Sequence, residues 1–289
     1  MTRSPGPSWS SALTGGNVPD PVRFSPEDIS RIAEERMSGE TCALRFTLFQ
    51  CRNPDDPMLS HEVRCFQQVL RPFLGELRTV NIVTTRPEAA LFADTDIFLV
   101  GGAGEYSVLD GAPFLHEFFD FLREIVARRW PMFASCFGFQ ALTVALGGTV
   151  VHDPEHLELG TVVVHLNSAG RADPVFGGLP ASFLAQVGHK DRAAQLPENA
   201  IPLAFSADCP YHAFRIRDTW IYATQFHPEM THEQNFERFL NYIRLYGEDT
   251  SPEAIARARQ QYRPSPEASA LIPRYVRHIL RHVDTGVRP

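Results

Sequence analysis

The sequence predicts an α/β fold of three layers, in which a mostly parallel β-sheet is covered by helices on both faces. From residue 43 to residue 146, short apolar segments alternate with longer segments whose apolar residues recur at helical spacing. Strands that alternate with helices in this way pair in parallel and bury both faces of the sheet. Gly101-Gly102 and Cys136 each follow directly after a strand-like segment. Parallel sheets bind ligands at these carboxyl ends of their strands.

Apolar spacing and turn residues define the predicted elements of this first part. A helix over 61–74 is indicated by apolar residues at helical spacing, and a helix over 113–129 begins with a proline and keeps one apolar face. A further helix over 137–146 ends at Gly147-Gly148. The predicted strands are short and apolar, and they cover 43–49, 77–83, 96–100 and 131–135.

The second part of the chain is predicted to be β-rich first and helical afterwards. Strand-like stretches over 149–222 are separated by turns at 168–170 and 177–178. Apolar periodicity then predicts helices over 232–246, 252–262 and 266–282. We therefore expect one main α/β domain over 42–247 and a C-terminal helical extension over 248–289.

The N-terminal residues differ from the rest in composition. Residues 1–24 are rich in Ser, Pro and Gly and lack apolar periodicity, which predicts a mobile arm. A short helix is expected after it, because Ser25-Pro26-Glu27-Asp28 combines a hydroxyl cap, a first-turn proline and acidic residues near the positive helix end. Residues 1–41 are thus predicted to be a mobile arm and a short helix.

Composition and charge exclude several classes of function. The chain has 289 residues and a formal net charge of −7, which argues against a surface for nucleic acid. No apolar run approaches the roughly 20 residues that span a bilayer, and no signal peptide is recognisable. Lys190 is the only lysine and precedes Asp191, so the chain has no Gly-Lys-Ser/Thr phosphate loop. Five cysteines without a Cys-x-x-Cys pair favour a reducing, cytoplasmic location.

The segment Ala134-Ser135-Cys136-Phe137-Gly138 is typical of a nucleophile between a strand and a helix. Such a nucleophile lies in a tight turn and needs small neighbours, which Ala134 and Gly138 supply. It also faces the positive end of the following helix, whose field favours thiolate over thiol. For this segment alone, a buried and unreactive cysteine is the alternative.

A second segment, Gln225-Phe226-His227-Pro228-Glu229, places a histidine at the end of a predicted strand. The carboxylate two residues later suits a group that orients the imidazole, which in turn deprotonates a thiol. A histidine in a loop beside a solvated glutamate is the alternative.

Together with Gly101-Gly102-Ala103, these two segments resemble class I glutamine amidotransferases in order and spacing. The likeness is nearest to the glutaminase domain of GMP synthase and its free-standing relatives, and it covers roughly residues 43–246. It implies a flavodoxin-like sheet with N- and C-terminal helical additions. Further matching positions are Glu158-Leu159-Gly160, Asp173-Pro174-Val175-Phe176, and His189 with Asp191.

The resemblance implies a catalytic triad and an oxyanion hole. Cys136 matches the nucleophile, and His227 matches the general base and acid. Glu229 matches the residue that orients His227. The backbone amides of Gly102 and Phe137 match the oxyanion hole, where fixed dipoles stabilise the tetrahedral intermediate.

Three further positions, Gln140, Gly188 and His189, match residues that bind the substrate in the family. The usual Ser-His-Gly-Asp of the family reads Gly188-His189-Lys190-Asp191 here, and Ala134 stands where a glycine is usual. No cofactor and no metal are predicted. The histidines 152, 156 and 165, and His189 with Asp191, complete no cluster at metal-ligand spacing.

We therefore predict a glutaminase that hydrolyses the side-chain amide of glutamine through a cysteine thioester and supplies ammonia to a separate synthetase. The chain has no Ser-Gly-Gly-x-Asp-Ser loop of the kind that marks the synthetase part of GMP synthase. Two alternatives stay open. One is a γ-glutamyl peptidase acting on a glutathione-like conjugate, which the altered loop over 188–191 favours. The other is a catalytically idle regulatory subunit.

A charged segment, residues 52–62, follows the first predicted strand at its carboxyl end. It includes Arg52, Asp55, Asp56, His61 and Glu62. The sequence leaves two interpretations of this segment: a contact with an acceptor or partner, or a solvated loop.

Overall fold

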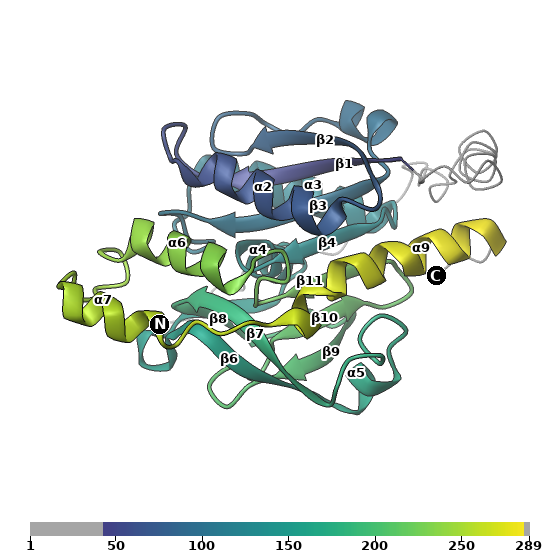
Figure 1. Ribbon diagram of the computed structural model, residues 1–289. Helices are drawn as coiled ribbons and strands as arrows, with labels where there is room; N and C mark the ends of the chain where they lie inside the picture. Colours follow the sequence, from purple (N-terminus) through teal and green to yellow (C-terminus); the bar gives the residue numbers. More distant parts are fainter. Residues whose placement is uncertain (1–42, 286–289) are drawn as a thin grey trace, which may run out of the picture.

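A computed structural model of the chain describes residues 43–285 (Figure 1). Its main sheet has nine strands in the order β2-β1-β3-β4-β11-β10-β9-β6-β7, and β5 pairs with β8 in a separate two-stranded ribbon. The arm and short helix predicted over 1–41 lie outside the described residues. The boundary of the main domain near residue 247 stays a prediction.

The strands of the main sheet have the following bounds: β1 Leu44–Cys51, β2 Leu74–Asn81, β3 Ile97–Ala103, β4 Met132–Ser135, β6 Glu158–Leu166, β7 Ser182–His189, β9 Ala200–Phe205, β10 Ala213–Ile216 and β11 Ile221–Thr224. The ribbon strands are β5 Thr149–His152 and β8 Asp191–Gln195.

The described α-helices are α2 Met58–Leu70, α3 Pro113–Ala127, α4 Phe137–Ala145, α5 Ser168–Ala172, α6 His232–Tyr242, α7 Pro252–Arg259, α8 Pro266–Ser269 and α9 Leu271–Thr285. Two short 3-10 turns, η1 and η2, cover Ala89–Asp94 and Pro154–His156.

One half of the main sheet is parallel. This half contains β3 and β4, whose carboxyl ends hold Gly101-Gly102 and Cys136. Strands β2, β1, β3, β4 and β11 pair in parallel, whereas β10, β9, β6 and β7 continue the sheet in antiparallel fashion. The predicted α/β fold with a mostly parallel sheet is confirmed. Because β1, β3, β4 and β11 run in the same direction, the residues that follow them meet at one edge of the sheet.

Alternating side chains of the central strands pack against different helices. Ile97 and Leu99 of β3 belong to the core cluster that includes residues of α2 and α9, whereas Phe98 and Val100 belong to the cluster that includes α3 and α4. This alternation follows from the two-residue period of a strand. It produces the three predicted layers: α2 with α9, the sheet, and α3 with α4 (Figure 1).

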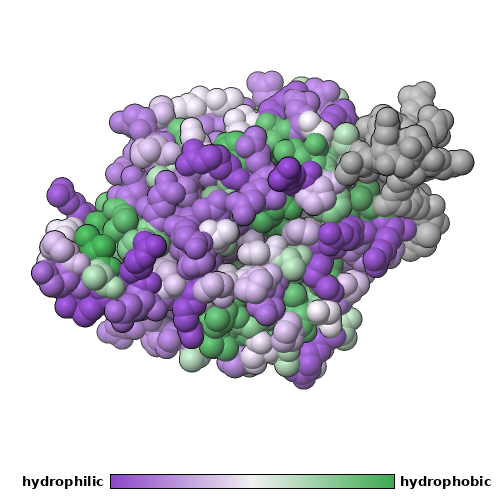
Figure 2. Space-filling model, viewed as in Figure 1, coloured by the Kyte–Doolittle hydropathy of each residue, from purple (hydrophilic) through white to green (hydrophobic). Residues whose placement is uncertain are grey.

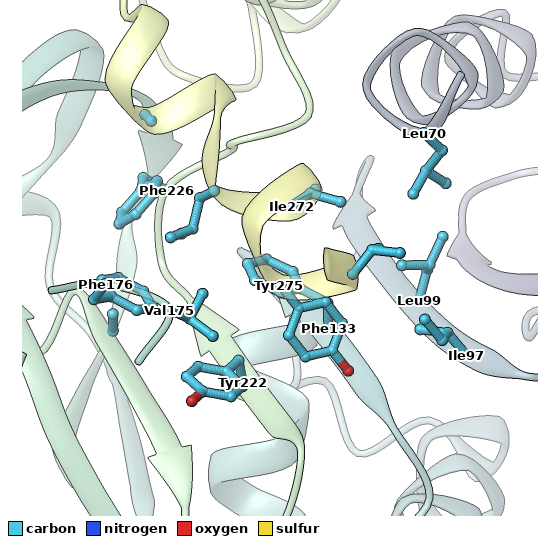
Figure 3. Packing of buried hydrophobic residues seen from close by; sticks show 14 of the residues in the cluster. Leu70, Ile97, Leu99, Phe133, Val175, Phe176, Tyr222, Phe226, Ile272 and Tyr275 are labelled. Carbon is cyan, nitrogen blue, oxygen red and sulfur yellow. The ribbon is translucent and has the colours of Figure 1, made fainter. Parts of the chain in front are cut away.

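Helix α9 belongs to the core of the molecule. Its Tyr275 is fully buried, and its ring lies 5.3 Å from that of Phe133 and 5.6 Å from that of Tyr222, measured between centroids (Figure 3). The Tyr275 hydroxyl donates a hydrogen bond of 2.7 Å to the carbonyl of Trp220. A segment expected to be an appended helix therefore covers strands β4 and β11, which deliver the two halves of the site.

The single helix predicted over 266–282 is wrong in one respect, because the structure divides it into α8 and α9 at Ala270. Pro273 is the reason. It has no N–H to donate to the carbonyl of Ser269, and its ring clashes with that carbonyl in a continuous helix.

The face shown in Figure 2 is mainly hydrophilic, and its hydrophobic residues lie in separate patches. In residues 43–285, no helix is long and apolar enough to cross a membrane. The cysteines at 51, 65, 136 and 209 are all buried and unpaired.

Candidate active site

Cys136 lies in a strained turn between β4 and α4. Its φ of 50° and ψ of −100° place a non-glycine residue in a rarely populated region of the backbone map. Its amide donates to the carbonyl of Thr224 at 2.8 Å, which ties the turn to β11. A Cβ at Gly138 would lie 2.7 Å from Cβ of Val100, so only glycine fits there. The close packing therefore fixes the conformation that presents the thiol.

His227 and Glu229 form a buried pair just after β11. The distance between His227 Nδ1 and Glu229 Oε1 is 2.6 Å, and both side chains are at most 2% exposed. The backbone amide of His227 donates to the carbonyl of Gln186 at 2.8 Å. Within the described part of the chain, His227 Nε2 has no hydrogen-bond partner, so this nitrogen is available to a reacting proton.

The ionised forms of Cys136 and His227 stabilise each other. Burial alone raises the pKa of the Cys136 thiol, but its interactions with His227, Arg238 and His189 lower that pKa from 9.0 to about 7. Burial alone disfavours a charged imidazole, yet Glu229 and the Cys136 thiolate together raise the pKa of His227. The arrangement favours a thiolate beside an imidazolium near neutral pH.

The backbone N–H groups at the two predicted oxyanion positions, Phe137 and Gly102, differ in their hydrogen bonding. Phe137 is the first residue of α4, where a backbone N–H has no acceptor within its own helix. The N–H of Gly102 donates to Glu62 Oε1 at 2.9 Å. A Cβ at Gly102 would lie 3.0 Å from Cε1 of His227, so the strand passes directly beside the imidazole. In this conformation a carboxylate of the protein occupies the Gly102 donor.

Glu62 belongs to a buried charge network that the sequence left open. Arg52 and Glu62 are 2% and 4% exposed, and Arg52 Nη2 lies 3.1 Å from Glu62 Oε1. Arg52 Nη1 donates to the Tyr242 hydroxyl at 2.5 Å, and that hydroxyl donates to Asp56. The interpretation of residues 52–62 as a solvated loop is wrong for these groups, because α6 covers them.

The cavity in front of Cys136 has a volume of about 390 Å³. Gln140 lies on its wall and donates through Nε2 to the carbonyl of Asp191 at 2.8 Å. Gly188 and His189 also line the cavity, so the structure brings all three predicted substrate-binding residues to the same space as the thiol. Lys190 lies at this cavity as well, where its ammonium donates to the carbonyl of Leu245.

Arg238 of α6 is a residue of this cavity that the sequence did not reveal. It is 4% exposed, its Nε has no partner in the described residues, and its Nη2 donates weakly to the carbonyl of Gly188 at 3.4 Å. A Cβ at position 188 would approach Arg238 Nη1 to 2.8 Å. Glycine in place of the family's usual serine therefore makes room for the guanidinium. One arginine among many carries no signal in the sequence alone.

Possible metal ligands gather at a place that was not expected. Among the described residues, the ligand atoms of Glu158, His189, Cys209 and His212 lie within 4.8 Å of one another. His152, His156 and His165 do not belong to this group. Of the histidines considered from the sequence, only His189 is a member.

The fold and the site define a glutamine amidotransferase-type protein. The structure superposes on a glutamine amidotransferase from Thermotoga maritima with a TM-score of 0.62 at 18% identity, covering 82% of this chain and 98% of that one. The family described as glutamine amidotransferase class-I matches residues 65–243. The chain therefore belongs to this family.

Two curated relatives are named as GMP synthases. The chain is 35% identical over 144 residues to a glutamine-hydrolyzing GMP synthase of Thermosipho africanus, a match that spans 50% of this chain and only 26% of that protein. The second relative, from Thermoplasma acidophilum, is a single subunit of a glutamine-hydrolyzing GMP synthase. The chain is 32% identical to it over 155 residues, covering 52% of this chain and 76% of that relative.

Proposed function

We propose that the chain is a glutaminase that hydrolyses the side-chain amide of glutamine through a thioester on Cys136 and supplies ammonia to a separate synthetase. One observation carries this proposal. A cysteine in a strained strand-to-helix turn has its pKa lowered to about 7, and its electrostatic partner is a histidine held at 2.6 Å by a buried glutamate. These are the parts needed for nucleophilic attack on an amide.

In the proposed reaction the Cys136 thiolate attacks the amide carbon, and His227 gives its proton to the leaving ammonia. Water then attacks the thioester, His227 takes a proton from that water, and glutamate leaves. Glu229 keeps Nδ1 of the imidazole protonated and thus directs Nε2 toward the reacting atoms. The amide of Phe137, together with that of Gly102 once Glu62 releases it, would hold the developing oxyanion.

The buried guanidinium of Arg238 supports a substrate with an amino-acid end. Arg238 has no carboxylate partner among residues 43–285, so its buried guanidinium can offer charged hydrogen bonds to an incoming carboxylate. We assign it the α-carboxylate of glutamine or of a γ-glutamyl group, and we assign the turn over 188–191 to the same end of the substrate.

The separate synthetase is supported by the relative that is itself named as one subunit of GMP synthase, most of which this chain matches. The four unpaired cysteines among the described residues fit a reducing compartment. A cytoplasmic location is therefore part of the proposal.

A γ-glutamyl peptidase is the second candidate, and the size of the cavity favours it. About 390 Å³ lies in the range of pockets that hold ligands larger than a single amino acid. A peptide bonded to the γ-carbonyl would extend past Lys190 and Leu245.

The third candidate, an idle regulatory subunit, is supported by the bond between Gly102 and Glu62, which occupies an oxyanion donor.

The deciding experiment compares glutamine with γ-glutamyl dipeptides as substrates of the purified chain, with glutamate release as the readout. Cys136→Ala should abolish turnover of either substrate, whereas Cys51→Ala, at a buried cysteine outside the site, should keep it. Slow hydrolysis of glutamine supports the glutaminase. Rapid hydrolysis of a dipeptide assigns the peptidase instead. If neither substrate is turned over, the assay is repeated with added synthetase chains, and no turnover there either assigns the idle regulatory role.

A further inference from the structure

Four side chains with metal-binding atoms meet in the core, outside the proposed triad. Glu158 begins β6, His189 ends β7, and Cys209 and His212 lie in the connection between β9 and β10. All four are at most 5% exposed, and their ligand atoms lie within 4.8 Å of one another. Three segments far apart in the sequence thus place a carboxylate, two imidazoles and a thiol around one point.

In its neutral form, His189 places an acceptor nitrogen opposite an acceptor oxygen. His189 Nδ1 lies 3.1 Å from the carbonyl of Asp191, and because a carbonyl only accepts, this nitrogen carries the proton. In a neutral His189, Nε2 is then a lone pair, and it lies 3.0 Å from Glu158 Oε2. This contact lacks hydrogen-bond geometry. A cation between the two atoms would satisfy both.

His212 brings a second imidazole to the same oxygen, here through a hydrogen bond. Its Nε2 lies 2.8 Å from Glu158 Oε2, and its Nδ1 has no partner among the described residues. Two imidazole nitrogens therefore converge on one buried carboxylate oxygen. Such convergence in a buried site is typical of ligands around a metal ion.

We propose that Glu158, His189, Cys209 and His212 bind a divalent metal ion of borderline softness, for which Zn²⁺ is the best match. One thiolate, one carboxylate and two neutral imidazoles balance the charge of the ion, so the buried site is neutral as a whole. Metal binding releases the proton of the Cys209 thiol to solvent. Four protein ligands leave no open position, so the ion is structural.

The distances fit this ion with small adjustments. Bonds of roughly 2.0–2.3 Å in a tetrahedral site separate the ligand atoms by roughly 3.3–3.8 Å. The two contacts to Glu158 Oε2, 2.8 and 3.0 Å, are slightly shorter than this separation, and the largest separation within the group is at most 4.8 Å. Small side-chain rotations reach the required geometry.

The surroundings orient these ligands as metal sites require. The Ser206 hydroxyl donates to Glu158 Oε1 at 2.7 Å, which leaves Oε2 directed at the imidazoles. The amide of Cys209 donates to the same hydroxyl at 3.0 Å, which fixes the backbone of that ligand. Outer hydrogen bonds of this kind are the usual support of metal ligands.

The site has an entry path and a consequence for the substrate cavity. His189 lines the cavity in front of Cys136, so an ion can reach the ligands from there. Once bound, the ion would join β6 and β7 to the connection before β10 and would fix the turn over 188–191. This inference does not depend on the proposed reaction.

The test measures metal in the full chain, purified from zinc-supplemented medium and desalted. We expect about one Zn²⁺ per chain by elemental mass spectrometry, and less than about a fifth of that in Cys209→Ser and in His212→Gln. Two matched controls should keep the metal: Cys51→Ser at another buried cysteine, and His156→Gln at an exposed histidine.

A spectroscopic measurement on the wild-type chain tests the proposal even if a variant fails to fold. Wild-type chain stripped with a chelator is titrated with Co²⁺, which should produce a thiolate-to-cobalt charge-transfer band that saturates at about one equivalent. Zn²⁺ should displace the cobalt and raise Tm. Wild-type chain without bound zinc and without this band overturns the proposal, as does full zinc retention in both ligand variants.

Discussion

At the residue scale, Cys136 is distinguished by its charge environment. The other described cysteines are also buried, but burial dominates there: it raises the pKa of Cys209 to about 12 and the pKa values of Cys51 and Cys65 further. Among these four described cysteines, only Cys136 combines a buried thiol with a histidine and a helix N-terminus.

We therefore predict that a glutamine-like diazoketone labels the chain once, at Cys136. With iodoacetamide, the rate of labelling should rise with pH around a midpoint near 7, because only the thiolate reacts and it prevails above the pKa. In His227→Ala the midpoint should move upward, since burial is then opposed only by the weaker interactions with Arg238 and His189. Peptide mapping that finds label spread over several cysteines would contradict this.

Substitutions of the two members of the buried pair, His227 and Glu229, should reduce kcat to different extents. His227→Ala removes the group proposed as both the base and the acid for the leaving group, so kcat should fall by roughly 100- to 10,000-fold. Glu229→Ala removes only the group that orients the imidazole, and we expect a smaller loss. Steady-state kcat at saturating substrate checks the order, and circular dichroism confirms that both variants fold. A larger loss for Glu229→Ala would reverse the assigned roles.

At the scale of elements, the end of β3 is held in a conformation in which one proposed oxyanion donor, the amide of Gly102, is occupied. The amide of Gly102 is bonded to Glu62 Oε1 at 2.9 Å, and Glu62 is in turn held by Arg52 and by Gln50. The competing carboxylate comes from α2, a different element from those that carry the proposed nucleophile and base.

Glu62→Gln should therefore raise kcat of the isolated chain, because a neutral amide competes less strongly for the Gly102 donor than a carboxylate does. The ceiling is the contribution of one oxyanion donor, on the order of 100- to 1,000-fold. Glu237→Gln, at an exposed glutamate also near His61, is the matched control and should leave kcat unchanged. A folded Glu62→Gln chain with unchanged or lower kcat would show that this bond does not limit the reaction.

Helix α9 gives a second prediction at this scale. Tyr275→Ala should reduce the free energy of unfolding by about 3–5 kcal/mol, since it removes a fully buried ring between β4 and β11. Tyr275→Phe should cost only about 0.5–1.5 kcal/mol, because the Trp220 carbonyl loses one hydrogen bond but still accepts from the amide of Met132. Urea denaturation measures both. Near-equal stability of the alanine variant would mean that α9 is not part of the core.

At the scale of the whole molecule, a free-standing glutaminase would waste glutamine unless its activity depended on a partner. The bond between Gly102 and Glu62 gives the proposed dependence a physical basis, because a partner that moves β3 away from Glu62 would release the proposed oxyanion donor. Such a partner must favour the released conformation through its own contacts.

We expect weak glutaminase activity alone and a large rise in kcat when the cognate synthetase chain is added. Assays of ammonia release, with and without that chain, measure the ratio of the two kcat values. This activation ratio should be smaller in Glu62→Gln, in which the Gly102 amide is held less strongly before the partner binds. A wild-type chain that turns over a γ-glutamyl peptide rapidly with no partner would favour the peptidase instead.

The sequence by itself determined the fold class and the residues proposed for the triad. Alternating strand and helix segments predict a parallel sheet, and the residues after its strands must meet at one edge. Cys136 and His227 each lie in a short contiguous segment whose neighbours reveal its conformation. The elements expected over 43–146 were predicted to within a few residues, whereas residues 149–222 were predicted only as β-rich, with a turn at 168–170 where the structure has α5. The helix over 266–282 is interrupted because of Pro273.

Only the tertiary structure decided which distant residues modify that site. Arg238 beside Gly188, Glu62 on the amide of Gly102, and Glu158 beside His212 each join segments tens of residues apart. Their separation along the chain follows no period and contains no motif. Burial and partners change what such residues do: Glu62, interpreted as a possible solvated charge, becomes a buried acceptor because α6 and Arg52 cover it. A single sequence records local conformation, whereas contacts between segments exist only once the chain has folded.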